Sequence, residues 1–389
     1  MSIDTIVYES KNTATRIALL SGGELVELEI VPENRAVEGN IYLGKIARKV
    51  DLANGKIGFF VELGEGREAF LNAEENGLDE LKVSEGQSLV VQVAQEKRAE
   101  KGPKVTRALQ FVGENLVYCP YRMNIEVSSK ITDKVKADEY RELVLDNTTG
   151  QEGWIVRTSA VNAPKEEVVA EMEYLRQSFE TVRIKARTLK APALLLAKAN
   201  PVFDYVNKYK AGLGKVVLNN RNIEAELKER FGAELATEIN AEPFAEYGLE
   251  DAIAEALNKT VSLKGGGRIT IEETKAFVAI DVDSGADKGN GSISRLNIEA
   301  AAEIARQIRL RNLSGKIIID FAGSSDYHFL KPVIEALEKE VAQDYTRTTV
   351  LGSSRAGNVE VIRVRKRPTL QDLLTVECES CQGTGRVMR

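Results

Sequence analysis

The stretch from Ala276 to Phe321 begins AFVAIDVDSG, continues through RLNIEAAAEIARQIRLRNLSG and ends KIIIDF. Its first and last pieces are short runs rich in valine and isoleucine, a pattern typical of buried strands. The first run ends at Asp281 and the second at Asp320. A strand, a helix and a second strand of these lengths form a crossover unit, so we expect parallel strands with both aspartates toward their carboxyl ends. Open α/β sheets bind their ligands at that edge.

The piece between the two strands has the spacing of a helix. One apolar stripe is formed by Ile298, Ala302, Ala305 and Ile308, and charged residues fall away from it. Gly315 follows a basic last turn and should end the helix.

Two carboxylates side by side at the ends of buried strands repel each other and are costly to desolvate. A divalent cation removes both penalties, and Mg²⁺ is commonly held by one or two carboxylates together with water and substrate phosphate. Asp283 lies on the same strand face as Asp281, which favours a metal site. The alternative, usual for an isolated acid in an α/β protein, is that each aspartate caps the turn that follows it.

These residues resemble the catalytic region of the ribonuclease E/G family, single-strand-specific endoribonucleases of bacteria. The family pattern runs close to AIDxNSG, NxEAAxEIARQLRLRxLGG and IxIDF, and the chain matches it in order at 279–285, 297–315 and 317–321. The resemblance implies that Asp281 and Asp320 bind a catalytic Mg²⁺, with Asp283 as a third catalytic residue. The family usually has asparagine at position 283, and Phe-Ile-Asp-Met where this chain has Phe-Ala-Gly-Ser after Asp320.

The composition of the 389 residues is that of a globular protein of more than one domain, with a formal net charge of −6. This charge argues against uniform binding of nucleic acid over the surface. No apolar run is long enough to span a membrane, the start lacks a secretory pattern, and three cysteines suit a reducing compartment, so we expect a cytoplasmic protein. With His328 as the single histidine, a metal-activated water is a more natural route to RNA cleavage than a histidine pair.

The expected fold class is a multidomain α+β and α/β chain. The resemblance implies an S1-type OB barrel inserted in a ribonuclease-H-like fold, followed by a mixed-sheet, DNase I-like catalytic domain and a C-terminal zinc-link knuckle. The expected parts are 1–36 with 206–258 (ribonuclease-H-like, structural only), 37–110 (barrel), 111–205 (5′-sensor-like), 259–370 (catalytic) and 371–389 (zinc-link). The chain is therefore expected to be a short form that ends at the zinc-link motif.

Short strands separated by turn signals predict the barrel, and GNIYLGKI and GQSLVVQV resemble an S1 RNA-binding domain. Such barrels stack bases on exposed aromatic side chains. Phe60, Phe70 and Lys101 match family positions that contact RNA. The alternative is that both phenylalanines are core residues. Because Phe59 and Phe60 are adjacent, they point to opposite faces, and one of them must face outward or toward a neighbouring domain.

The residues Val127, Arg157 and Thr158 resemble the family's pocket for a 5′ monophosphate, since an arginine and a hydroxyl at a strand end can capture phosphate. An ordinary exposed Arg-Thr pair is the alternative. The family usually has glycine where Glu126 precedes Val127, and a carboxylate there would weaken or abolish a 5′-end preference.

A later strand leads to Arg363 and Arg365, where the family has Arg-x-Arg. Their positive charge would hold the RNA backbone. A solvated basic strand explains the pattern equally well.

Cys378 and Cys381 form a CxxC followed by Gly-Thr-Gly. A structural zinc needs four ligands, and the chain has no second pair, so two chains related by a two-fold axis would complete a site. The pattern resembles the family's zinc-link, which implies a homodimer, or a higher oligomer, that shares Zn²⁺. Glu379 stands where the family usually has proline.

The sequence thus predicts a Mg²⁺-dependent endoribonuclease that cleaves single-stranded RNA in RNA processing or decay and leaves a 5′ phosphate and a 3′ hydroxyl. Two other functions stay open. One is an RNA-binding paralogue that has lost catalysis, suggested by Asp283 and by the changes after Asp320. The other is a zinc-linked scaffold of an RNA-decay or ribosome-maturation assembly.

Overall fold

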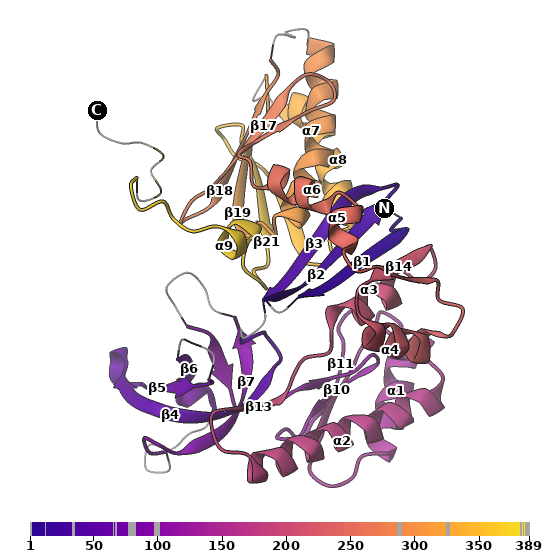
Figure 1. Ribbon diagram of the computed structural model, residues 1–389, viewed down its shortest axis with the longest axis vertical. Helices are drawn as coiled ribbons and strands as arrows, with labels where there is room; N and C mark the ends of the chain where they lie inside the picture. The colour runs from indigo at the N-terminus through magenta and orange to yellow at the C-terminus, as the bar shows by residue number, and fades with distance from the viewer. Residues whose placement is uncertain are drawn as a thin grey trace. The chain divides into compact units, whose positions relative to one another are not determined.

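The computed structural model describes residues 2–11, 13–32, 36–64, 66, 68–76, 83–96, 102–285, 290–323, 327–381, 383 and 385. The chain divides into two compact units, residues 1–33 with 200–389 and residues 34–199. Its architecture is mixed α/β, with a closed barrel and mixed sheets, as expected (Figure 1). The finer division into five parts, the DNase I-like assignment and the zinc knuckle stay predictions. Among the described residues, no helix has both the length and the apolar character needed to cross a membrane.

The first sheet of the first unit has the strand order β15-β14-β1-β2-β3. Its strands are β1 (Thr5–Lys11), β2 (Ala14–Ser21), β3 (Glu24–Pro32), β14 (Lys215–Leu218) and β15 (Thr237–Ile239). The first three form an antiparallel meander, while β14 pairs in parallel with β1 and with β15. Segments far apart in the sequence therefore complete one sheet.

Helices cover both faces of this first sheet. One face packs on α3 (Pro201–Tyr209) and α4 (Arg221–Phe231), and the other on α5 (Pro243–Glu246) and α6 (Leu249–Ala256). Burial on both faces explains why β1, β2 and β14 carry short continuous apolar runs rather than an alternating pattern.

The second sheet of this unit has the order β16-β17-β18-β19-β21-β20. Its strands are β16 (Thr260–Ser262), β17 (Arg268–Glu273), β18 (Val278–Asp283), β19 (Gly315–Asp320), β20 (Thr348–Ser353) and β21 (Val359–Arg363). The helices α7 (Asn290–Leu310) and α8 (Tyr327–Val341) lie beside this sheet (Figure 1). Their buried side chains form one core with those of its strands. The predicted crossover is confirmed, because β18 and β19 pair in parallel on either side of α7 in the chain.

The buried stripe of α7 differs from the predicted one. Ala305 and Ile308 are buried as expected, but Ile298 is 41% exposed and Ala302 is exposed as well. The helix buries Leu296, Ala300, Ala301 and Ile304 instead. An alanine-rich helix offers several apolar stripes of similar width, and contact with the sheet selects one of them.

The second unit contains the barrel and a smaller sheet. The barrel strands are β4 (Ile41–Asp51), β5 (Ile57–Glu62), β6 (Ala69–Asn72), β7 (Ser88–Gln95) and β8 (Lys104–Thr106). Pairing of β4 with both β5 and β7 closes the barrel, and β13 (Ala193–Leu196) adds to β4.

The smaller sheet has the order β11-β12-β10-β9. Its elements are β9 (Phe111–Val112), β10 (Leu116–Cys119), β11 (Ile125–Val127), β12 (Gly153–Val156), α1 (Lys134–Asp146) and α2 (Lys165–Thr188). They enclose a core around Trp154, and Cys119 is buried nearby as a small side chain.

Candidate active site

The crossover brings Asp281 and Asp320 together. They are register partners on β18 and β19, and both are exposed. Neighbouring strands lie about 5 Å apart, so the two carboxylates project side by side from the same face of the sheet. The alternating neighbours Ile280, Val282 and Ile319 are buried toward α7 and α8. Burial of these apolar residues therefore forces the aspartates onto the opposite, open face.

The third acid, Asp283, is already held by protein groups. Its register partner on β17 is Arg268, whose Nη2 donates to Oδ2 at 2.6 Å. The backbone N–H of Gly285 donates to Oδ1 at 2.9 Å. The hydrogen bond from Gly285, and then that from Arg268, lower the pKa of Asp283 below its ordinary value. Asp283 is therefore ionised, with both oxygens engaged.

Arg268 was not singled out from the sequence. The signal that would have found it is the short connection at residues 274–277 between β17 and β18, closed by a hydrogen bond from Thr274 N to Phe277 O. Counting outward from this connection sets the register and pairs position 268 with position 283.

The turn after Asp320 is supported by Asn297 on α7, a second residue without a role assigned from the sequence. Asn297 is 0% exposed, and its Nδ2 donates to the backbone oxygen of Ala322 at 2.8 Å. The side chain thus ties the crossover helix to the chain segment that follows the second aspartate. Gly323 comes next with φ +97, and Ser324 lies outside the described residues.

The donor set fits Mg²⁺. Asp281 and Asp320 offer adjoining hard oxygen atoms on an accessible face, and this ion commonly uses one or two carboxylates with water completing its shell. Within the described residues, no group of three or more His, Cys, Asp or Glu side chains gathers into a metal cage. Because Asp283 is engaged by Arg268 and Gly285, the site reduces to the acid pair with an ion-paired neighbour.

The RNA-binding role predicted for Arg363 is wrong. Arg363 is 3% exposed, and its Nε donates to Asp344 at 2.7 Å in an ion pair whose two side chains are each 2% exposed. Its Nη1 also donates to Asn312 and to the backbone oxygen of Leu313. The alternation of β21 points Arg363 to the same side as Val359 and Val361, away from the open face. Arg365 is exposed, and its predicted role stays a prediction.

The barrel places Phe60 and Phe70 opposite each other on β5 and β6. Both are half-buried, and their ring centroids lie 5.9 Å apart in an edge-to-face arrangement. Phe59 is 1% exposed while Phe60 is half-buried, so the expectation that these two neighbours point to opposite faces is confirmed. A Cβ at Gly58 would lie 2.5 Å from Cε2 of Phe70, which shows that glycine makes room for that ring. Lys101 lies outside the described residues.

The residues of the predicted 5′-phosphate pocket follow one end of the small sheet. Val127 pairs with Val156 at the ends of β11 and β12, and Arg157 and Thr158 follow directly. The Arg157 guanidinium donates to the backbone oxygen of Gly113, and Thr158 is exposed. Glu126 falls on the opposite strand face from Val127 and accepts a hydrogen bond from Asn124 at 2.5 Å. Phosphate binding by Arg157 stays a prediction.

Cys378 is exposed and Cys381 is partly buried, and neither forms a disulfide bond within the described residues. Backbone N–H groups of Cys381 and Ser380 point at the Cys378 sulfur and lower the pKa of its thiol. A thiolate is the form that binds zinc, so the local geometry suits a metal ligand.

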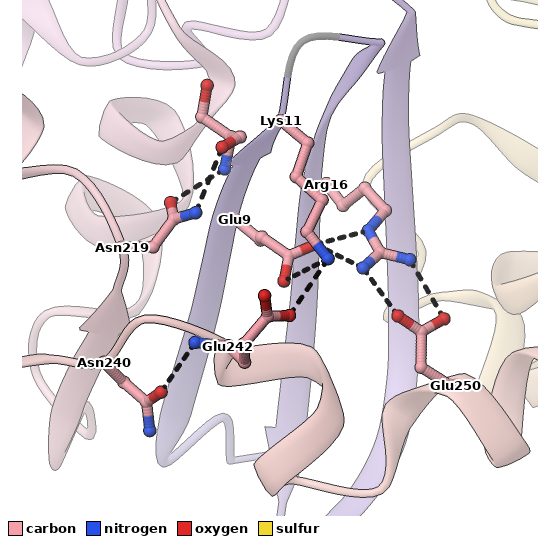
Figure 2. A network of polar contacts seen from close by, with 8 residues as sticks. Glu9, Lys11, Arg16, Asn219, Asn240, Glu242 and Glu250 are labelled. Atoms are coloured by element: carbon pink, nitrogen blue, oxygen red, sulfur yellow. Dashed lines mark hydrogen bonds and ion pairs between the residues drawn. The ribbon is translucent and has the colours of Figure 1, made fainter.

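A second acidic group lies in the first sheet, near the ends of β1 and β14 (Figure 2). Glu9 is 0% exposed; Arg16 donates to its Oε2 through Nε at 3.0 Å, and Lys11 Nζ lies 3.3 Å from Oε1. Arg16 also donates to Glu250 on α6 at 2.7 Å. Asn219, just after β14, bonds the backbone of Ser10 rather than offering a free oxygen. The cations close this carboxylate off from a metal.

Comparisons with known proteins cover the segment that contains the acid pair. The model of the Ribonuclease E/G family matches residues 110–366. "Ribonuclease G" of Haemophilus influenzae is 32% identical over 409 residues, which cover 96% of this chain and 82% of that protein. "Ribonuclease G" of Escherichia coli K12 is 31% identical over the same shares. "Ribonuclease E" of Escherichia coli K12 is 29% identical over 98% of this chain but only 38% of its own length.

Proposed function

The chain belongs to the ribonuclease E/G family, and we propose that it is an endoribonuclease that hydrolyses single-stranded RNA during RNA processing. The observation that carries the proposal is the pairing of Asp281 with Asp320 on the open face of the second sheet. The relatives named Ribonuclease G and Ribonuclease E support the reaction class.

In the proposed reaction, the chain's own residues bind the metal ion and keep its ligands in place. Asp281 and Asp320 would hold Mg²⁺, which when bound lowers the pKa of water and neutralises charge on the scissile phosphate, consistent with 5′ phosphate and 3′ hydroxyl ends. Asn297 keeps the segment after Asp320 in place through Ala322. The buried face of the sheet, packed on α7 and α8, gives the two acids a rigid support.

We further propose that the barrel contributes RNA affinity through Phe60 and Phe70. Their half-buried rings on adjacent strands offer surfaces on which bases can stack. Arg48 lies 4.0 Å from the centre of the Phe60 ring and adds positive charge beside it.

Cleavage of a single-stranded RNA with Mg²⁺ tests the reaction. We expect the wild-type protein to give products with 5′ phosphate, and Asp320→Ala to give none. The matched control is Glu360→Gln, which removes an exposed carboxylate from the same face, opposite Ile318 on β19, and should cleave normally. Equal products from the wild type and from Asp320→Ala would contradict the proposal.

A catalytically inactive RNA-binding paralogue is the second candidate function. It is favoured by the ion pair that engages Asp283, at a position where the family usually has a neutral asparagine. Tight binding of single-stranded RNA by the wild type, without Mg²⁺-dependent cleavage, would support this candidate.

We also propose a homodimer joined by Zn²⁺ shared between the Cys378 and Cys381 pairs of two chains. The lowered pKa of Cys378 supports a thiolate ligand. Mass in solution, measured before and after zinc chelation, should change from dimer to monomer, and Cys378→Ser should mimic chelation. Cys119→Ala, which alters a buried thiol, is the control. A dimer that survives chelation would rule out the zinc link.

A further inference from the structure

Three carboxylates share one corner of the open sheet face, and Arg268 is placed among them by the register. Asp320 pairs with Asp281, and Asp283 lies two residues further along β18, opposite Arg268 on β17. We propose that Arg268, oriented by Asp283, contacts the RNA phosphate beside the acid pair. This inference rests on the proposed function and adds a substrate-binding residue to the same site.

The geometry leaves the guanidinium able to bind a second anion. Within the part of the chain that the structure describes, its hydrogen bond is the one from Nη2 to Asp283. The Arg268 side chain is 61% exposed, and Asp283 is 39% exposed. A guanidinium carries a planar fork of N–H donors that matches the oxygens of a phosphate. The donors not used by Asp283 therefore remain available on the open face.

The negative charges of this corner explain why a cationic side chain such as Arg268 would favour RNA binding there. Like charges around the scissile phosphate would repel RNA, and Asp283 adds one negative charge to the acid pair. A divalent ion would offset Asp281 and Asp320, and Arg268 offsets Asp283. The corner then becomes neutral overall while presenting a cationic group to the incoming backbone.

A simpler alternative is that Arg268 does no more than cancel the charge of Asp283. Both ideas predict that Arg268→Ala weakens RNA binding. They differ for the double variant Asp283→Asn/Arg268→Ala, which removes both charges and leaves the net charge of the corner unchanged. Charge cancellation predicts that the double variant binds like the wild type. A phosphate contact predicts that it still binds less tightly.

The experiment measures the affinity of the full chain for a single-stranded RNA as a function of salt. It uses Mg²⁺-free buffer without chelator, so that any zinc stays bound. We expect both Arg268→Ala and the double variant to lose roughly tenfold in affinity and to show a salt slope lower by about 0.7, the value of one phosphate contact on a single strand. Arg268→Lys, which retains the charge, should keep the slope.

The matched control is Lys259→Ala. Lys259 is paired with Glu272 of β17 at 3.0 Å, in another exposed ion pair four residues from Arg268 along the strand, and its loss should leave the slope unchanged. A double variant with wild-type affinity and slope would overturn the role of Arg268. Cleavage by the wild type with Mg²⁺ is measured in parallel. If the wild type cleaves while the double variant binds normally, this inference alone fails; if the wild type does not cleave, the proposed function fails instead.

Discussion

The two sheets of the first unit both carry acidic residues on inner strands, but these residues are buried and ion-paired in one sheet and exposed in the other. In the first sheet, Glu9 on β1 is 0% exposed and closed by Arg16 and Lys11, beside α5 and α6 (Figure 2). In the second sheet, Asp281 and Asp320 are exposed, because α7 and α8 pack on the other face. A carboxylate on a strand thus becomes structural where a helix and a cation cover it. It becomes available to a ligand where its face is left open.

The largest expected effect is on cleavage by Asp281→Asn. This variant should lose roughly 10³-fold or more in single-turnover rate, since a metal ion contributes several kcal/mol and about 1.4 kcal/mol corresponds to tenfold. Its thermal stability should be equal to that of the wild type or higher, because one repulsive charge beside Asp320 is removed. A variant that cleaves normally would mean that the open acids are no more catalytic than Glu9.

The next effect concerns the buried face of the same sheet. Arg363→Met should lower the free energy of unfolding by about 3–5 kcal/mol, because Asp344 is left buried without its partner. Arg363→Met/Asp344→Leu should recover most of this loss, as measured by urea unfolding. A loss of RNA affinity in Arg363→Met without a loss of stability would contradict the structural role.

The stability of this ion pair should depend on pH. Burial alone would raise the pKa of Asp344, but hydrogen bonds from Arg363 and Thr348 lower it below its ordinary value. A lowered pKa in the folded state contributes stability that is present above the unfolded-state pKa of about 3.9 and is lost as the pH falls through the folded-state pKa. The difference in stability between the wild type and Arg363→Met should therefore shrink below about pH 4.

Glu9→Gln should have a smaller effect, and on stability alone. Replacing the charge partner of Arg16 should cost about 1–3 kcal/mol, the usual range for a buried hydrogen bond to a charged group. Cleavage should be unchanged at temperatures where the variant is folded. Glu9→Gln should therefore lower stability without affecting cleavage, and Asp281→Asn should do the opposite. Loss of cleavage in a stable Glu9→Gln protein would contradict the proposed difference between the two sheets.

The smallest expected effect is the loss of RNA affinity in Phe60→Ala. The barrel offers the same comparison between a covered and an accessible side chain, because Phe59 and Phe60 are adjacent and point to opposite faces. Phe60→Ala should weaken RNA binding by about 1 kcal/mol, the low end for a stacked base, because Arg48 already covers part of the ring. Phe59→Ala should instead destabilise the barrel by about 3–5 kcal/mol, since its side chain fills the core. Fluorescence anisotropy with labelled RNA measures the loss of affinity, and thermal unfolding measures the loss of stability. Equal RNA affinity of Phe60→Ala and the wild type would exclude a stacking role.

Much of this arrangement could be predicted from local patterns. The valine-rich and isoleucine-rich runs before Asp281 and Asp320, with a helix between them, require a parallel crossover, and the crossover brings the acids together. Alternation likewise separates Phe59 from Phe60. These features depend on the period of strands and helices, which is encoded by residues close together in the chain.

Other features could not be predicted, because they depend on partners from distant segments. Arg363 is basic and lies two residues before Arg365, yet the register of β21 and the position of Asp344 make it a core residue. Arg268 becomes part of the site only through its pairing across the sheet with Asp283. The stripe that α7 buries is selected by the sheet beneath it.

The sequence by itself determined the order of the strands and helices around the crossover, the barrel strands, and the pairing of two acids. The tertiary structure alone decided which face of each sheet is covered, and therefore which charged residues are structural and which are accessible. The physical reason is that periodicity is a local property of the chain, whereas desolvation and ion pairing depend on the segments that pack against a residue from elsewhere in the fold.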